Sequence, residues 1–493
     1  MSLYRQLNKC LFPCQEDSEF LPRSEIIARV TETNIKLAIP IRKRCFSNRS
    51  LPRTILSQAR NVFSILVLIQ ETQAIVDLVC RDNIRDEDLP LTRQSVSGDD
   101  ENVLISPKTG KTFSSFSFWP REARVRDFLN FQWLVQAPVL SLLGQHISLD
   151  PKCPLPLIDY VMKCKSGPNS VLHKCKIHGA HQTLFKNDPE PYVAVKEVNN
   201  DEAFEKEKAN LELIQSLKHE HLIKLIATCQ KGPICYFIFP WADGGDLRDF
   251  WKANDPKSRS QELVLWSLRQ MLGIVSAIDA LHGKNTRHGD IKPQNILHFL
   301  KTHNDATMDS RGRLILADVG VSKIHREITS MRQDPTNCQQ STVTYEAPEA
   351  QSDQREGKPR GRRYDMWSLG CMFLEFTVWL VFDYSTVRSF RKSRRTRDDP
   401  KDAFGSFFVQ TSDKLIQIHS AVIEALGHLQ GHPLCSGNTA LADLIQLIQD
   451  HLLQVDVQKR TQAPELFKML ESITRRAEED SSYLYPMFDS KNG

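Results

Sequence analysis

Apolar residues recur at helical spacing in the first part of the chain. They do so in residues 57–79 and again within residues 121–143, and the first segment contains neither proline nor glycine. Side chains three and four positions apart lie on one face of a helix, so this spacing indicates amphipathic helices. Residues 99–111 between them are polar and rich in turn-forming types. The pattern predicts a mostly helical N-terminal region, and it contains no cluster typical of a catalytic site.

A different pattern follows, with short runs rich in β-branched and aromatic residues. Proline and glycine gather between residues 148 and 170, which indicates a boundary between domains. Beyond it we expect a helix at residues 202–217, and strands at residues 171–177, 192–198, 225–229 and 235–239. Strands with one helix, followed by a longer and mostly helical part, predict an α+β architecture.

The composition is that of a globular protein. Of 493 residues, 40% are hydrophobic and 25% are charged, and 64 basic side chains against 60 acidic ones leave a formal net charge of +4. This balance argues against a general nucleic-acid or membrane partner. The 12 cysteines include no C-x-x-C pair, which fits a reducing intracellular setting, cytoplasmic or nuclear.

Two segments bear on targeting and membranes. The N-terminal residues reach Pro13 and then acidic side chains before any long apolar core, which is not typical of a signal peptide. Residues 366–382 are mostly apolar but include Glu375. A buried helix therefore explains that segment better than a membrane span.

The stretch from His288 to Asn295 places a carboxylate, an ammonium and a carboxamide close together. Phosphoryl transfer to a hydroxyl needs a base for the hydroxyl proton, positive charge beside the phosphate and oxygen ligands for Mg²⁺. Asp290, Lys292 and Asn295 supply one group for each task.

This stretch resembles the catalytic loop of protein kinases, H-R-D-x-K-x-x-N, with Gly289 in place of the usual arginine. Further motifs of that family follow in its order between residues 171 and about 470. They are the V-A-V-K run ending in Lys196, the A-D-V-G run containing Asp318, the A-P-E triplet at residues 347–349, the helix start at residues 364–371 and Arg460. The chain is similar to eukaryotic-type serine/threonine protein kinases, in particular fungal ones with a long helical N-terminal region.

The resemblance implies a bilobal protein-kinase-like fold preceded by a mostly α-helical region. The implied parts are an N-terminal region at residues 1–165, an amino lobe at about 166–242, a carboxy lobe at about 243–475 and a tail at 476–493. It also implies ATP and Mg²⁺ as cofactors, and protein substrates with serine or threonine acceptors. Lys292 and Thr342 favour those acceptors over tyrosine.

The resemblance also implies roles for single residues in the chemical step. Asp290 would accept the proton of the substrate hydroxyl, and Lys292 would neutralise the γ-phosphate. Asn295 and Asp318 would bind Mg²⁺. Asp365 would hold the backbone of the catalytic loop in place.

Other residues are implied in nucleotide binding. Lys196 would hold the α and β phosphates of ATP and pair with Glu207, for which Glu205 and Glu212 are alternatives. Phe239 falls at the gatekeeper position. Because Pro240 has no N–H group, Ala242 is the better donor to adenine.

The chain departs from the family pattern in three places. The glycine-rich loop G-x-G-x-x-G is reduced to Gly179, with charge from Lys174, Lys176 or His181 as a substitute. Gly289 removes the arginine that pairs with a phosphorylated activation segment, and Val319 replaces the phenylalanine of D-F-G. These departures motivate a second hypothesis, a pseudokinase that acts as a nucleotide-binding or scaffold module.

Two further alternatives concern other features. A small-molecule phosphotransferase is disfavoured by the A-P-E triplet, whose Glu349 we expect to pair with Arg460. The six basic residues between Arg388 and Arg397 favour a solvated loop, with a dock for acidic substrates or a nuclear-targeting patch as alternatives.

Overall fold

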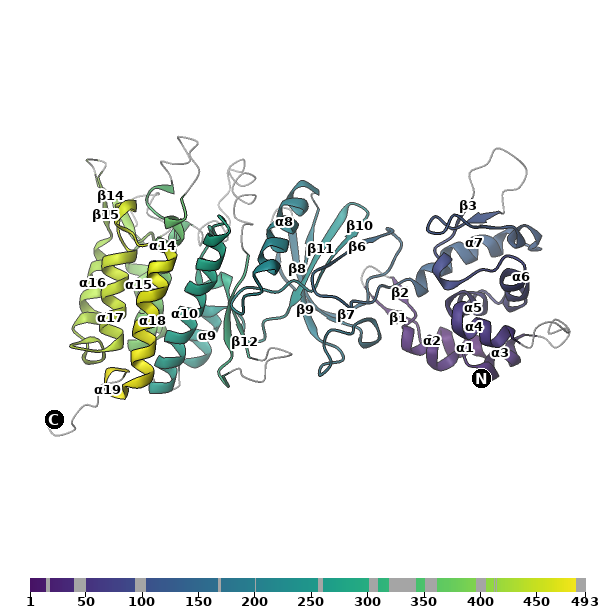
Figure 1. Cartoon of the computed structure of the whole chain (residues 1–493), viewed down its shortest axis with the longest axis horizontal. Coiled ribbons are helices and arrows are strands. Elements are labelled where there is room, and N and C mark those ends of the chain that lie inside the picture. The colour runs from purple at the N-terminus through teal and green to yellow at the C-terminus, as the bar shows by residue number, and fades with distance from the viewer. Residues whose placement is uncertain are drawn as a thin grey trace. The chain divides into compact units, whose positions relative to one another are not determined.

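The computed structural model divides the chain into two compact units (Figure 1). The first unit joins residues 1–201 to residues 225–241, and the second joins residues 202–224 to residues 242–493. The structure describes all residues except 15–17, 40–49, 94–102, 167–169, 200, 256–259, 301–308, 319–342, 351–360, 396–404, 412, 414 and 485–493.

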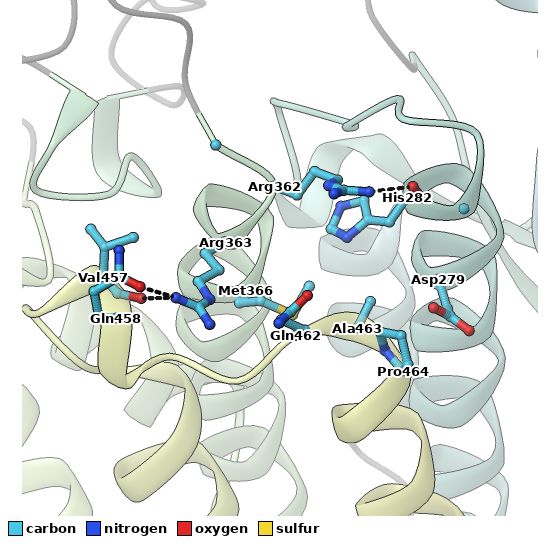
Figure 2. Close-up of a pocket in the computed structure, with 12 residues that line it drawn as sticks. Asp279, His282, Arg362, Arg363, Met366, Val457, Gln458, Gln462, Ala463 and Pro464 are labelled. Carbon is cyan, nitrogen blue, oxygen red and sulfur yellow. Dashed lines mark hydrogen bonds between the residues drawn. The ribbon is translucent and has the colours of Figure 1, made fainter.

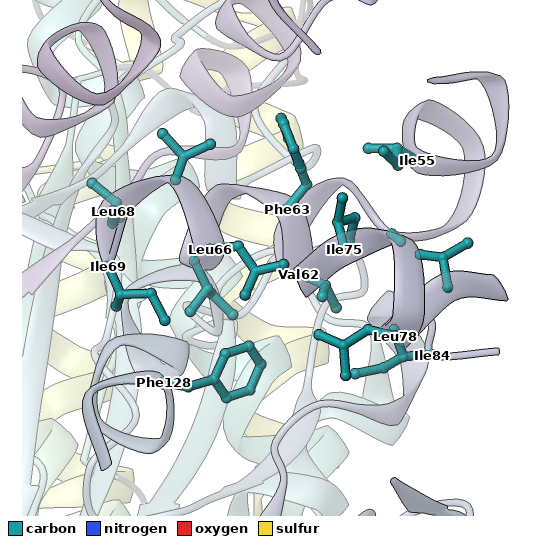
Figure 3. Packing of buried hydrophobic residues seen from close by; sticks show 14 of the residues in the cluster. Ile55, Val62, Phe63, Leu66, Leu68, Ile69, Ile75, Leu78, Ile84 and Phe128 are labelled. Atoms are coloured by element: carbon teal, nitrogen blue, oxygen red, sulfur yellow. The ribbon is translucent and has the colours of Figure 1, made fainter. Parts of the chain in front are cut away.

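The N-terminal part of the first unit is helical, as predicted. Its helices are α1 (Leu3–Asn8), α2 (Arg23–Arg29), α3 (Glu32–Ala38), α4 (Leu51–Gln58), α5 (Arg60–Leu68), α6 (Ile75–Cys80) and α7 (Glu122–Phe131). Two short strands, β1 (Phe12–Pro13) and β2 (Glu19–Phe20), form a two-stranded sheet. Three more, β3 (Thr92–Arg93), β4 (Leu104–Ile105) and β5 (Thr112–Phe113), form a three-stranded sheet. Helix α5 runs through the apolar core, and every residue from Val62 to Leu68 is buried (Figure 3).

The segment between residues 57 and 79, which was predicted to be helical, contains separate helices. Helix α4 ends at Gln58, and Ala59 has φ −140°, outside the helical region. Helix α5 starts there because the Asp86 carboxylate accepts hydrogen bonds from the backbone N–H groups of Asn61 and Val62, both at 3.0 Å. A cap from a residue that far along the chain leaves no sign in the local periodicity.

A six-stranded sheet forms the rest of the first unit. Its strands are β6 (Gln145–Leu149), β7 (Leu157–Ser166), β8 (Ser170–Ile177), β9 (Tyr192–Val198), β10 (Ala227–Lys231) and β11 (Ile234–Pro240). They lie in the order β6-β10-β11-β9-β8-β7, with β6 parallel to β10 and the other neighbours antiparallel. The four predicted strands correspond to β8, β9, β10 and β11.

The structure differs from the boundary expected at residue 166. Strand β6 and most of β7 precede that residue, so residues 145–165 contribute to the same sheet as the Lys196 strand. The neighbour of β6 lies far along the chain, since His146 pairs with Thr228 and their side chains hydrogen-bond at 2.8 Å. A short strand with so distant a partner shows no hairpin pattern in the sequence.

The N-terminal helical part contacts the sheet near the end of β8. Phe20 is fully buried, packs with Ile158 and presents its ring to the edge of His181. The backbone N–H of Arg23 donates to His181 Nε2 at 3.2 Å, so Nδ1 carries the proton and donates to the Pro138 carbonyl at 3.1 Å. Burial lowers the pKa of His181 to about 4, which keeps the ring neutral.

The second unit is mainly helical. Its helices are α8 (Asp201–Leu217), α9 (Leu247–Asn254), α10 (Gln261–Gly283), α14 (Arg363–Val381), α15 (Tyr384–Ser393), α16 (Ser420–Gln430), α17 (Ala440–Leu447), α18 (Ala463–Glu479) and α19 (Ser481–Leu484). Its strand pairs are β12 (Ile296–Phe299) with β13 (Arg313–Leu316) and β14 (Phe408–Gln410) with β15 (Ile416–Ile418). Helices α10 and α18 pack side by side (Figure 1).

Two apolar helices of the second unit bear on the question of a membrane. Every residue of α14 from Tyr364 to Val381 is buried, which confirms the buried helix predicted for residues 366–382. Among the described residues, α10 is the one helix long and apolar enough to cross a membrane, but 61% of that window is buried inside the protein. That burial is typical of a core helix.

The basic segment that starts at Arg388 is not a solvated loop. Helix α15 covers much of it, and Arg391 and Arg394 reach back to the fully buried Glu375 of α14, at 2.6 and 2.9 Å. Arg394 is itself buried, with its guanidinium over the Phe407 ring. A buried carboxylate needs basic partners. The sequence alone does not show that Glu375 finds them in this basic segment, so the segment was predicted to be a solvated loop.

Candidate active site

The segment from His288 to Asn295 is a connection between α10 and β12 that is held by one buried carboxylate. Asp365 on α14 accepts hydrogen bonds from the backbone N–H groups of His288 and Gly289, both at 2.8 Å, and from His282 Nε2 at 2.9 Å. Burial alone would raise the pKa of Asp365, but the hydrogen bond and charge of His282 and the loop N–H groups lower it overall. The role predicted for Asp365 is therefore confirmed by its contacts.

The three polar side chains of this loop lie within hydrogen-bonding distance of one another. Lys292 Nζ is 2.8 Å from Asp290 Oδ2, and Asn295 Nδ2 donates to the same oxygen at 3.0 Å and to the Asp290 carbonyl at 2.7 Å. The amide nitrogen of Asn295 is used in both bonds, which leaves its oxygen as the atom suited to a cation. A carboxylate, an ammonium and a carboxamide group thus meet at one point.

Asp318 lies just beyond β13, beside the same loop. The Ala317 N–H donates to the Asn295 carbonyl at 2.8 Å, and His288 Nε2 lies 3.0 Å from the Ala317 carbonyl. Asp318 is exposed and has φ +60°, a left-handed conformation uncommon for a residue with a side chain. Such strained residues cluster at functional sites. Val319 and Gly320 lie outside the described residues.

Glu349 of the A-P-E triplet forms an ion pair with Arg460, which lies shortly before α18. Arg460 donates to Glu349 Oε1 at 2.7 Å and to Oε2 at 2.8 Å, and Arg460 is 1% exposed. This two-point contact matches the planar guanidinium to the carboxylate. The predicted pair is confirmed.

Comparison with known proteins agrees with this geometry. The protein kinase domain family matches residues 179–470, more than half of the chain. The chain belongs to the protein kinase family.

Its curated relatives include serine/threonine kinases. A calcium/calmodulin-dependent protein kinase of Metarhizium anisopliae is 29% identical over 37% of this chain and 41% of its own length. One of the same description from Emericella nidulans is 31% identical over 36% of this chain and 37% of its own. A serine/threonine/tyrosine-protein kinase of Arabidopsis thaliana is 29% identical over 41% of this chain and 49% of its own. The chain thus spans less than half the length of these relatives.

In the six-stranded sheet, alternate side chains of β9, the strand that contains Lys196, lie on opposite faces. Val193 and Val195 are buried in the sheet's apolar core, so Ala194 and Lys196 lie on the other face. Phe239 is paired with Ala194 across the strands and therefore shares that face. The predicted gatekeeper and the predicted phosphate-binding lysine are thus on one surface.

Among the carboxylates considered as partners of Lys196, the structure distinguishes one. Glu207 is 4% exposed and lies on α8 with the buried Leu211, whereas Glu205 and Glu212 are exposed. Lys196 and Glu207 belong to different units, so their ion pair stays a prediction. The role of Ala242, whose carbonyl accepts from the Gly245 N–H at 3.2 Å, also stays a prediction.

Gly179 lies elsewhere than a glycine-rich loop would. The family pattern ends in a β-forming valine, so the loop precedes a strand, but Gly179 follows β8 in a short 3₁₀ turn, Gly179–His181. A side chain there would press on the Pro189 carbonyl at 2.9 Å. Residues 167–169, between β7 and β8, lie outside the described residues, and Gly167 is the glycine in their sequence. Sequence reasoning missed it because K-S-G-P-N-S keeps a single glycine.

The residues proposed to compensate by charge have partners of their own. Lys176 forms an ion pair with Asp159 at 2.9 Å, and the neutral His181 binds Arg23. Lys174 Nζ lies 4.5 Å from the Tyr192 ring centre and 4.6 Å from that of Trp241. Lys174 and Lys176 both lie on the Lys196 face, since they pair with Ala194 and Tyr192 across the strands, but the charge of Lys176 is paired with Asp159.

A separate cavity of about 400 Å³ lies in the second unit, between the end of α10 and the starts of α14 and α18 (Figure 2). Arg362 donates to the His282 carbonyl at 2.7 Å, and Arg363 donates to Gln458 Oε1 at 2.6 Å. Its walls hold none of Asp290, Lys292 and Asn295. Both guanidiniums donate to protein oxygens.

Proposed function

We propose that this chain is a serine/threonine protein kinase that transfers the γ-phosphoryl group of ATP to protein hydroxyls. The observation that supports this best is the joint placement of Asp290, Lys292 and Asn295 on a loop fixed by Asp365, with Asp318 beside it. Membership of the family implies ATP and Mg²⁺ in general, and similarity to proteins named serine/threonine-protein kinases, from Eremothecium gossypii and Arabidopsis thaliana, favours serine and threonine acceptors.

The roles follow from the chemistry of each group. Asp290 is the base that orients the acceptor hydroxyl and takes its proton, and Lys292 places positive charge beside the transferring phosphate. The Asn295 amide oxygen and the Asp318 carboxylate are the hard oxygen ligands that Mg²⁺ prefers, and the described residues contain no group of three or more His, Cys, Asp or Glu side chains that could hold a metal. Two protein ligands suffice where phosphate oxygens complete the shell, and bound Mg²⁺ neutralises phosphate charge.

The residues assigned to the nucleotide follow the family pattern. Lys196 contacts the α and β phosphates, supported by the buried carboxylate of Glu207, and the Ala242 N–H binds adenine. We assign the role of the glycine loop to the sequence around Gly167, before β8, rather than to Gly179. With one glycine in that sequence, we expect weaker ATP binding than in kinases with the full pattern.

A transfer assay with radiolabelled ATP and a generic protein acceptor tests the proposal. Asp290→Asn should lower kcat by ~10²–10⁴-fold, because a positioned base contributes about that much. Asp309→Asn, a partly exposed aspartate between β12 and β13, is the matched control. Absence of transfer by the unmodified protein with Mg²⁺ and with Mn²⁺ would favour the pseudokinase hypothesis instead.

A further inference from the structure

Two arginines bind one buried carboxylate, Glu375 of α14, and a third arginine lies within electrostatic range of it. Glu375 binds Arg391 through both carboxylate oxygens, at 2.6 and 3.0 Å, and binds Arg394 at 2.9 Å. Arg248 on α9 is a third cation that acts on Glu375. Burial alone would raise the pKa of Glu375, but these guanidiniums lower it far below its usual range, so the group is ionised.

This cluster extends to the segment that precedes the A-P-E triplet. The Tyr345 hydroxyl donates to Glu375 Oε2 at 2.7 Å, and Arg391 Nη2 lies 3.4 Å from the same hydroxyl. The Tyr345 carbonyl in turn accepts from Ser368 of α14 at 2.8 Å. Arg391 therefore contacts the segment that directly precedes the A-P-E triplet.

Arg248 connects the cluster to the catalytic loop itself. Its guanidinium faces the amide of Gln294, which accepts from it when the amide oxygen is turned toward the arginine. Gln294 lies two residues after Lys292, and Arg248 also acts on Tyr345. Arg248 thus contacts the base-bearing loop at Gln294 and lies within electrostatic range of Tyr345.

The charge of this cluster is positive. Glu375 is paired with two guanidiniums and lies within electrostatic range of a third, and Arg394 is fully enclosed while Arg248 and Arg391 are partly exposed. Two cations that keep contact with water near the acceptor site attract anions and repel lysine and arginine side chains.

We propose that Arg248 and Arg391 form a subsite for an anionic side chain that flanks the acceptor serine or threonine, so that this kinase selects acidic or phosphorylated peptides. The inference rests on the proposed function and deepens it. It assigns Arg391 to substrate recognition as well as to the neutralisation of Glu375.

The test compares three peptides that share one acceptor serine and differ in their flanks, which are aspartate and glutamate, uncharged residues, or lysine. A fourth peptide carries phosphoserine as its flank and distinguishes the two sources of negative charge. With the full chain, kcat/KM for the acidic peptide should exceed that for the uncharged one by roughly tenfold, and the lysine peptide should be the poorest substrate. The preference should weaken as salt is raised.

Variants locate the preference. Arg248→Gln should reduce the ratio of kcat/KM between acidic and uncharged peptides to roughly threefold or less, and Arg248→Glu should invert it. Arg269→Gln, an exposed arginine paired with Glu478 on another face of the unit, should keep the ratio. Arg391→Lys, which keeps the charge beside Glu375, provides a second variant that is expected to fold.

Binding of the same peptides with alanine in place of the acceptor separates this inference from the function. Fluorescence anisotropy should show the acidic peptide bound most tightly, and Arg248→Gln should remove the difference. Equal binding of acidic, uncharged and lysine peptides would overturn the subsite even if transfer is observed. Acidic preference in binding without any transfer would overturn the kinase assignment and keep the subsite.

Discussion

Asp365 offers the sharpest test of how the catalytic loop is held. In Asp365→Asn, the amide oxygen can take the place of Oδ2 and keep the bonds from His288 N–H and His282. The amide NH₂ then faces the Gly289 N–H, where Oδ1 was the acceptor, so two donors oppose each other in a fully buried place. One hydrogen bond to a charged group is lost, at a cost of ~1.5–3 kcal/mol.

That loss has two measurable results. For a unit of this size it should lower the melting temperature in a thermal-shift assay by roughly 4–10 °C. It should also lower kcat more than it raises KM for ATP, since Gly289 adjoins Asp290 and Asp365 touches neither substrate. Asp279→Asn, a partly buried aspartate on α10, is the control. If Asp365→Asn kept both its melting temperature and its kcat, the loop would be held by something other than this carboxylate.

Two more predictions concern backbone strain and pH. Gly289 has φ +80°, so Gly289→Ala should lower the free energy of unfolding by ~1–2 kcal/mol, as measured by thermal melting. Gly427→Ala, in helix α16 with open space around it, should be neutral or stabilising. Equal effects of the two substitutions would contradict backbone strain at Gly289. His181 has a pKa of about 4 against an ordinary 6.5, so the folded chain binds fewer protons than the unfolded one between these values, and stability should fall as pH drops from 6.5 toward 4. His181→Gln should flatten this pH dependence and the exposed His428→Gln should not, as followed by melting temperature against pH.

The elements that carry the motifs could be predicted because their signals are local. The alternation of Val193 and Val195 with Ala194 and Lys196 is a property of four adjacent residues, and the structure shows the corresponding strand with two faces. The loop from His288 to Asn295 could be predicted for the same reason. Its three polar groups are close in sequence, and the short 3₁₀ turn at Pro293–Asn295 brings them together in space.

Features that depend on distant partners could not be predicted in this way. The start of α5 depends on Asp86, and the burial of Arg391 and Arg394 depends on Glu375, more than a dozen residues earlier. Only the order of the strands shows that Gly179 follows β8. A single glycine carries no sequence pattern from which this position could be predicted.

Strand β6 has a practical consequence for anyone who shortens this protein. A chain that begins at residue 166 would lack β6 and most of β7, and would leave β10 with an unpaired edge where Ala227–Lys231 now bond to Gln145–Leu149. Unpaired edges recruit other chains, so such a fragment should aggregate. A fragment that starts before Gln145 keeps this edge covered, and one that also keeps Phe20 and Arg23 retains the contacts that cover the end of β8.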